Sequence, residues 1–172
     1  MRAIVVIASA LVLTGVCKAS STSFLIRGDA QIGNFSVKNG ATLGAAVAAF
    51  GQPDTREFNN LADVCTARWN AIELRMVFVN FAGDDPCGNT TGFFIKATMR
   101  SPGQWETDRG LRIGSSISQL RELYPAASYH RSVANWWLIS RFKAVVAGGV
   151  FPGLMAHVRA GRVVSFTVQV RP

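Results

Sequence analysis

The sequence has few of the residues that carry acid–base and metal chemistry. It contains two histidines, His130 and His157, and three cysteines among 172 residues. General acid–base catalysis needs a histidine, or a carboxylate with a partner, and a zinc site needs more ligands than these residues supply. No serine stands in a nucleophile-elbow pattern, and no glycine-rich loop precedes a helix in phosphate-binding form. We therefore expect no catalytic residue, no metal and no cofactor; an enzyme that uses His130 or His157 is the alternative.

Residues 1–19 are predicted to be a secretory signal peptide. A basic residue precedes an apolar run from Ala3 to Leu13, which is too short to span a bilayer comfortably. Cleavage after Ala19 is the favoured interpretation. The alternative is a lipoprotein anchored through Cys17, although Val16 precedes it where lipidation normally requires a small residue. We expect a secreted, periplasmic or cell-envelope protein with no transmembrane span after signal removal.

Acidic residues are also scarce. The chain has 10 Asp and Glu against 18 Lys and Arg, a formal net charge of +8, and loss of Arg2 and Lys18 with the signal lowers it by two. Such a charge in an exported protein fits an acidic protein surface, an anionic envelope polymer or lipid headgroups. Export argues against a nucleic-acid partner.

Two cysteines, Cys65 and Cys87, remain after signal removal, and such a pair normally oxidises in an exported protein. Residues 66–69 and 73–81 read as an antiparallel hairpin, which places Cys65 beside the turn-rich loop 82–91 that carries Cys87. We therefore predict a Cys65–Cys87 disulfide.

Asp84, Asp85 and Asn89 in the same loop offer oxygen ligands for calcium. Their spacing matches no known calcium loop, so a plain turn is the favoured interpretation.

Residues 40–53 predict a short helix with clear ends. Gly40 permits a tight entry, and the Thr42 hydroxyl can accept a hydrogen bond from an amide of the first turn. Gly51 can end the helix, and Pro53 prevents its continuation. The apolar residues at helical spacing are Leu43, Ala46, Val47 and Phe50.

The pattern of this helix returns in the second half. Residues 111–125 align with 37–51 without a gap, so that Gly114 falls on Gly40 and Ser116 on Thr42. Ser116 with Gln119 is also a capping box. We therefore predict two tandem repeats, residues 20–100 with the disulfide and residues 101–172.

The remaining segments suggest the fold class. A strand or pair of strands is predicted over 24–38, further strands at 93–100 and 135–142, and a hairpin at 154–159 and 162–170. Residues 54–64 read as polar and irregular with a helical turn near Leu61, and 101–110 as a linker. The predicted class is α+β: two tandem repeats, each a short helix or helix pair packed on one face of an antiparallel sheet.

Gly40, Thr42, Gly51 and Pro53, in the order G-x-T…G-x-P, resemble the helix signature of small outer-membrane assembly lipoproteins, the SmpA/OmlA type. A tandem duplication of such a unit in a secreted, disulfide-bearing chain resembles the β-lactamase inhibitory protein fold. That resemblance implies two helix-plus-sheet repeats whose sheets join into one concave, protein-binding surface.

The resemblance covers residues 35–170 in layout but only 37–53 and 111–125 in motif. In the second motif, Pro125 replaces the closing glycine. The resemblance assigns no β-lactamase-inhibiting role to particular residues, and implies only a protein-binding scaffold of the envelope or exterior.

Strand alternation predicts which side chains leave the core. Along 93–100, one face would hold Phe93, Ile95, Ala97 and Met99, and the other face the residues between them. Trp136 and Trp137 must point to opposite faces, and the sequence alone does not show which is buried. The residues assigned to the exposed face, as candidate partner-binding residues, are Arg75, Phe94, Lys96, Arg100, Arg141, Arg171 and Trp137.

Arginine together with aromatic residues on a shallow surface is typical of binding hot spots. We therefore expect an exported, non-catalytic protein that recognises another protein through the uncovered face of its sheet, as an inhibitor or adaptor would. The alternative is a basic envelope component that binds an anionic polymer or lipid surface. Basic residues that merely solvate the face are the simplest interpretation of all.

Overall fold

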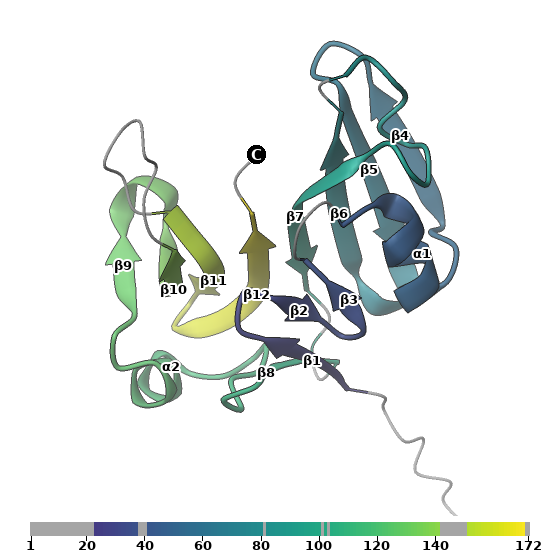
Figure 1. Ribbon diagram of the computed structural model, residues 1–172. Helices are drawn as coiled ribbons and strands as arrows, with labels where there is room; N and C mark the ends of the chain where they lie inside the picture. The colour runs from purple at the N-terminus through teal and green to yellow at the C-terminus, as the bar shows by residue number, and fades with distance from the viewer. Residues whose placement is uncertain are drawn as a thin grey trace, which may run out of the picture.

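The computed structural model describes residues 23–37, 41–80, 82–100, 102, 104–141 and 151–170, and these fold mostly into β-structure. The described residues form two sheets, of four and eight strands, and two short helices, whose arrangement can be followed in Figure 1. The predicted α+β class, with helices packed on a sheet in each repeat, is therefore wrong. The two segments read from the sequence as irregular and as a linker contain strands, at Thr55–Asn59 and Trp105–Thr107, and each of the two helices has no more than eight residues.

The larger sheet is continuous across both halves of the chain and antiparallel throughout, in the order β4-β5-β6-β7-β12-β11-β10-β9. The seam between the halves is the pairing of β7 with β12. Its strands are β4 (Thr55–Asn59), β5 (Val64–Trp69), β6 (Leu74–Val79), β7 (Phe93–Met99), β9 (Ser128–His130), β10 (Asn135–Arg141), β11 (Phe151–Arg159) and β12 (Arg162–Gln169).

The smaller sheet has the order β3-β2-β1-β8. Its outer strand β8 comes from the predicted linker and pairs parallel with β1, with Phe24 opposite Trp105. The opening segment of the chain is thereby tied to the connection between the halves. The four strands are β1 (Phe24–Arg27), β2 (Gln31–Ile32), β3 (Phe35–Ser36) and β8 (Trp105–Thr107).

The predicted start and end are confirmed for α1 (Leu43–Phe50), and the predicted start is confirmed for α2 (Ile117–Leu123). The Thr42 hydroxyl accepts a hydrogen bond from the Ala45 amide at 3.3 Å, and Gly51 has φ +81°, a conformation that glycine adopts without strain. Both hydrogen bonds of the Ser116–Gln119 capping box are present.

Two hairpins share one turn form. The β5–β6 turn contains the 3₁₀ turn η1 (Asn70–Ile72) and the β9–β10 turn contains η2 (Arg131–Val133). Each ends on a left-handed residue, Glu73 with φ +46° and Ala134 with φ +51°. Each half thus runs from a helix through four consecutive antiparallel strands.

An aromatic cluster joins α1 and the small sheet to one face of the large sheet, which we call the covered face. Phe50 of α1 lies 5.9 Å from Trp69 and 6.4 Å from Trp105, centroid to centroid. Phe24 stacks on Trp105 at 4.9 Å. Because Trp105 is fully buried and donates to the Ile72 carbonyl at 2.8 Å, this contact fixes the small sheet against the β5–β6 turn.

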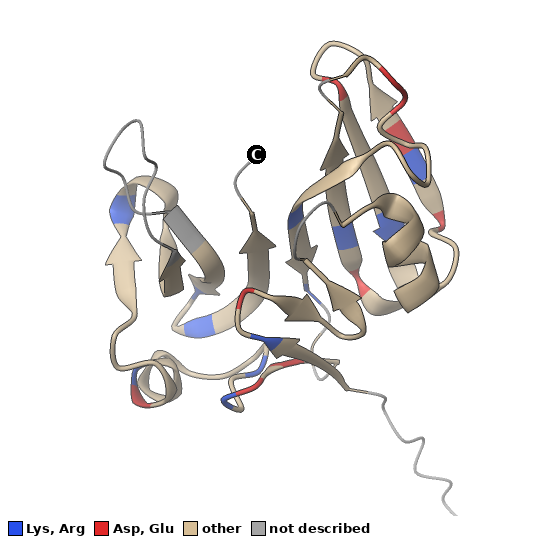
Figure 2. Cartoon of the chain, in the orientation of Figure 1, with Lys and Arg blue, Asp and Glu red and all other residues tan. Residues whose placement is uncertain are grey.

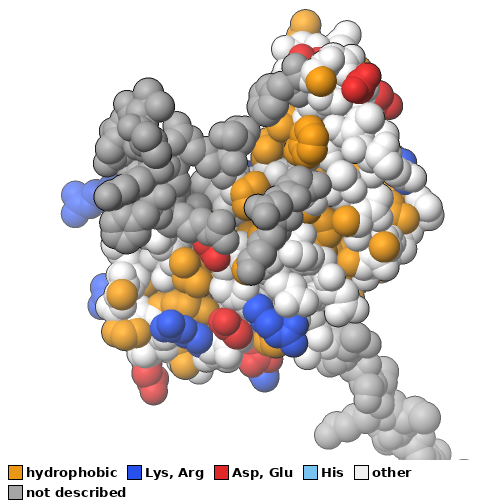
Figure 3. Space-filling view, in the orientation of Figure 1, with side chains coloured by type: hydrophobic (Ala, Val, Ile, Leu, Met, Phe, Trp, Pro, Cys, Tyr) orange, Lys and Arg blue, Asp and Glu red, His pale blue; other side chains and the backbone are white. Residues whose placement is uncertain are grey.

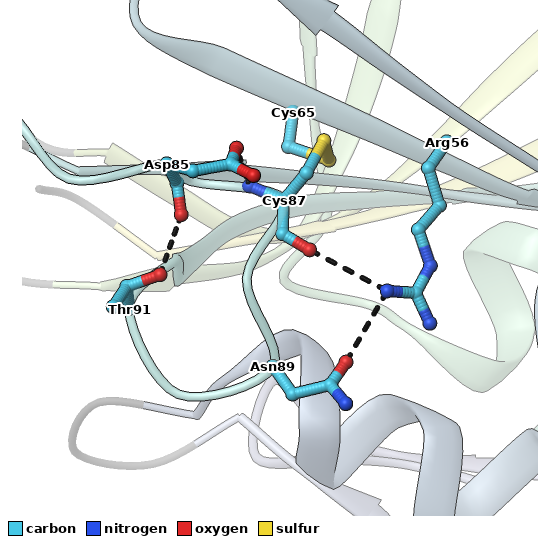
Figure 4. The surroundings of a disulfide bond; sticks show 6 residues. All are labelled: Arg56, Cys65, Asp85, Cys87, Asn89 and Thr91. Carbon is cyan, nitrogen blue, oxygen red and sulfur yellow. Dashed lines mark hydrogen bonds between the residues drawn. A yellow bond between two sulfur atoms is a disulfide. The ribbon is translucent and has the colours of Figure 1, made fainter.

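The predicted Cys65–Cys87 disulfide is present and holds the loop 82–91 beside α1 (Figure 4). Arg56 of β4 donates to the Cys87 carbonyl at 3.5 Å and to Asn89 Oδ1 at 3.3 Å. The Gly44 amide donates to the Asn89 carbonyl at 2.8 Å. The loop is thus fixed to a strand by a covalent bond and to the helix by the backbone.

Gly44→Ala tests this close approach. Alanine normally stabilises a helix over glycine by about 1 kcal/mol, but a Cβ at residue 44 would lie 2.6 Å from the Asn89 carbonyl oxygen. We expect the free energy of unfolding to fall by about 1–3 kcal/mol in urea titrations of the oxidised protein. Ala48→Gly, on the exposed side of α1, should cost only the helix-propensity difference. A stabilised Gly44→Ala protein would contradict the contact.

Candidate functional site

The face of the large sheet opposite the covered face carries an uninterrupted row of aligned residues. Each member is directly opposite the next in the strand register, so their side chains lie on one side of the sheet. We call this side the open face, since Arg75, Lys96 and Arg100 are exposed on it. The row, from β5 to β10, is Arg68, Arg75, Thr98, Thr167, Met155 and Trp137.

A hollow of about 220 Å³ lies at the first-half end of this row. We call it the basic pocket, because three of its lining residues are arginines and one is acidic. Figure 2 shows the basic segments of β5, β6 and β7 side by side in blue. The lining residues are Arg68, Trp69, Asn70, Glu73, Leu74, Arg75, Thr98 and Arg100.

The cations of the open face are poorly neutralised. Arg68 makes an ion pair with Glu57 at 3.4 Å, with both side chains well exposed, and exposed pairs contribute little. Within the described residues, the side chains of Arg75, Lys96 and Arg100 make no ion pair or hydrogen bond. Arg68 and Arg75 are also directly opposite each other, and such like-charged cross-strand pairs are destabilising.

Aromatic and polar side chains occupy the second-half end of the row. Trp137 is half-buried and stacks on His130, with ring centroids 3.4 Å apart and an interplanar angle of 12°. His130 Nε2 lies 2.9 Å from Ser128 Oγ. Trp136 is the buried member of the tryptophan pair and packs on the covered side, beneath Arg121 of α2.

Four of the predicted site residues, Arg75, Lys96, Arg100 and Trp137, lie on the open face as expected. Arg75 and Arg100 meet in the basic pocket, Lys96 lies one row away, and Trp137 lies at the other end. Arg141 ends β10, but its side chain is outside the described part of the structure, as is Arg171.

The placement of Phe94 on the exposed face is wrong. A β-bulge shifts the β6–β7 register, so that Val77 faces Lys96 whereas Phe78 faces Phe94. Ile95 is the extra residue, and it reverses the side on which all earlier β7 residues lie. Phe94 is therefore only 4% exposed and contacts Phe35 and Phe78 in the core, while Phe93 is 45% exposed.

Sequence reasoning missed Arg68, Asn70 and Met155. Arg68 could have been found, because a hairpin that turns near residue 70 brings it opposite Arg75. Asn70 reaches the pocket through the 3₁₀ turn, and Met155 reaches the row through the β7–β12 seam. Neither of these arrangements has a local sequence signal.

His157 and Tyr124 are titratable side chains with specific neighbours in the described structure. His157 Nδ1 is 2.8 Å from Asn135 Oδ1, and burial raises the pKa of Tyr124, which lies on the covered side beneath Arg109. Among the described residues, no three His, Cys, Asp or Glu side chains gather closely enough to hold a metal ion. In the same part of the chain, neither helix has the length and apolar character needed to cross a membrane.

Comparisons with protein-family models, curated proteins and solved structures find no match to this chain. The resemblance to outer-membrane assembly lipoproteins and to the β-lactamase inhibitory protein fold therefore stays a prediction.

The repulsion between Arg68 and Arg75 should lower the free energy of unfolding by a measurable amount. We expect Arg75→Gln to raise the free energy of unfolding by about 0.2–1 kcal/mol at low salt, because it removes the like-charge pair with Arg68. The gain should shrink in 1 M salt, where charges are screened within about 3 Å.

Lys96→Gln is the matched control, because Lys96 faces Val77 and Gln169 and loses the same charge without such a neighbour. Urea unfolding at two salt concentrations measures both variants. Equal effects of the two substitutions would show that the Arg68–Arg75 repulsion is negligible.

Proposed function

We propose that this chain is an exported, non-catalytic protein that recognises another protein through the open face of its eight-stranded sheet. The observation that carries the proposal is the aligned row that joins the basic pocket at Arg75 to the half-buried aromatic side chain of Trp137. Unneutralised arginine and partly exposed tryptophan are the residues most enriched in protein-binding hot spots.

The dimensions of the row favour a protein partner. Four strand-to-strand steps separate Arg75 from Trp137, which corresponds to roughly 19 Å along the sheet. A standard interface of about 800 Å² per partner is wide enough to cover both ends. A purely anionic polymer or lipid surface would use the cations but gain little from the partly exposed Trp137.

The covered face of the large sheet, on the other side of the molecule, supports the choice of the open face as the binding surface. Figure 3 views the chain from the side of α1, and there blue basic side chains lie at the edges and across the lower part of the view. Buried aromatics on that side hold α1 and the small sheet in place. The covered face is thus occupied by the fold itself, and the open face is the one left for a partner.

Export is the second part of the proposal. The Cys65–Cys87 disulfide is typical of oxidising compartments. Residues 1–19, which carry the predicted signal peptide, lie outside the described residues.

Cross-linking of the mature protein in its native envelope or culture fluid, with mass spectrometry of the adducts, tests the proposal. We expect one dominant protein adduct that is lost in both Arg75→Glu and Trp137→Ala. Arg27→Ala, an exposed cation of β1 on the other layer, removes one charge and should keep the adduct. Thermal unfolding followed by circular dichroism verifies that each variant is folded.

Two results would contradict protein recognition by this face. One is a protein adduct that survives in both Arg75→Glu and Trp137→Ala. The other is the absence of any protein adduct together with retention on envelope material that falls steeply with salt, which indicates polymer or lipid binding by charge alone.

A further inference from the structure

The basic pocket is built as a small grid on three adjacent strands. Across one row lie Arg68, Arg75 and Thr98, in direct register. The second row is formed by Asn70, Glu73 and Arg100, since the Arg100 amide extends the β6–β7 pairing by donating to the Glu73 carbonyl at 3.3 Å. The pocket is thus a place where several polar side chains converge.

We propose that this pocket receives a single carboxylate, the side chain of an Asp or Glu on an exposed loop of the partner protein. The inference rests on the proposed function, because it takes the ligand to be part of a protein. The proposed function identifies the surface that binds, and this inference adds the chemical type of the partner residue that binds there.

Charge complementarity is the first argument. Three arginines and one acidic residue, Glu73, line the pocket, so the net charge of its lining is positive. The Cβ atoms of directly opposed residues such as Arg68 and Arg75 are about 4.5–5.5 Å apart. A carboxylate placed between their guanidinium groups converts a repulsion into two charge-assisted contacts.

The free donors are the second argument. Arg75 sits on the middle strand, between Arg68 and Thr98, and its guanidinium has no partner within the described residues. The side-chain amide of Asn70 and the Thr98 hydroxyl are likewise unengaged in the described structure, although the Asn70 backbone amide donates to Asp54 Oδ2 at 2.6 Å. A guanidinium fork matches the two oxygens of a carboxylate, and hydroxyl and amide donors can satisfy its remaining lone pairs.

The pocket is also held in shape before any ligand arrives. Trp69 and Leu74 are buried beneath it, and Trp69 donates to the Gly51 carbonyl at 2.9 Å. At the turn, the left-handed Glu73 donates its amide to the Asn70 carbonyl at 3.1 Å. A preformed floor lowers the ordering cost of binding.

The lining favours a carboxylate over a phosphate. Glu73 lines the pocket and Glu57 pairs with Arg68, so two carboxylates already offset two of the three arginine charges, and a single monoanion neutralises the one that is left. Phosphate sites ordinarily use backbone amides of glycine-rich loops or helix N-termini. The residues that line this pocket include no glycine and come from three strands, one 3₁₀ turn and the residues directly beside them, Glu73 and Arg100.

An NMR titration tests the inference without the partner. The probes are N-acetyl-aspartate N-methylamide, its asparagine counterpart and inorganic phosphate, and the readout is the Nε–Hε resonances of the arginines. We expect saturable shifts at Arg68, Arg75 and Arg100 with the aspartate probe, with a Kd on the order of tens of millimolar. The asparagine probe should leave these resonances unchanged.

Substitutions of Arg75 distinguish two-point recognition by its guanidinium group from attraction by its positive charge alone. Arg75→Gln should abolish the shifts at Arg68 and Arg100, and Arg75→Lys, which keeps the charge but not the fork, should weaken binding by at least about threefold. Arg27→Lys is the matched control and should bind as the unmodified protein does. The inference is overturned by absent shifts, by equal response to the asparagine probe, by tighter binding of phosphate, or by an Arg75→Lys protein that binds normally.

The NMR titration and the cross-linking experiment can fail independently, so failure of the carboxylate pocket can be told apart from failure of the proposed function. Saturable aspartate binding together with a cross-linked adduct that ignores Arg75→Glu and Trp137→Ala would retain the carboxylate pocket and refute protein recognition by this face. Absent probe binding together with an adduct lost in both variants would refute only the carboxylate pocket.

Discussion

The pairing of β7 with β12 is the contact on which the open face depends. On the covered side of this seam, Met99 faces Phe166 and Ala97 faces Val168, and all four side chains are fully buried. Burial of a large apolar side chain stabilises by about 1.5–3 kcal/mol, so the seam is a strong junction. On its other side, the same pairing aligns Thr98 with Thr167. The two halves therefore present one surface, and a cation of the first half shares a row with a tryptophan of the second.

The two faces of the large sheet contribute differently to stability. Phe24, Phe50 and Trp105 fill the space between α1, the small sheet and the covered face, and this cluster supplies packing that tolerates little change. The open face is free of that requirement and can retain opposed cations that lower stability. Charge kept at a cost in stability is a common property of binding surfaces.

Features encoded by a few neighbouring residues were predictable, and features set by distant pairing were not. Thr42 and Ser116 define their helix starts locally, and the β5–β6 hairpin placed Cys65 beside the loop that carries Cys87. Phe94 was misplaced because a bulge is visible only in the register with the partner strand. Strand β4 was missed because all five of its residues are exposed, which leaves no alternation. Once such strands are counted, the fold is mostly β and not the predicted α+β.

Strand β4 is an edge of the large sheet, and its unpaired backbone groups could template the addition of a strand from another chain. Two charges, Arg56 and Glu57, discourage this. Arg56 also bonds to Gln52 at 2.8 Å and to the carbonyl of Cys87, so the edge is strapped to the disulfide-held loop. Reduction of the disulfide would release Cys87 and weaken this hydrogen bond to Arg56. Formation of the disulfide would thereby also help to protect the β4 edge from pairing with another chain.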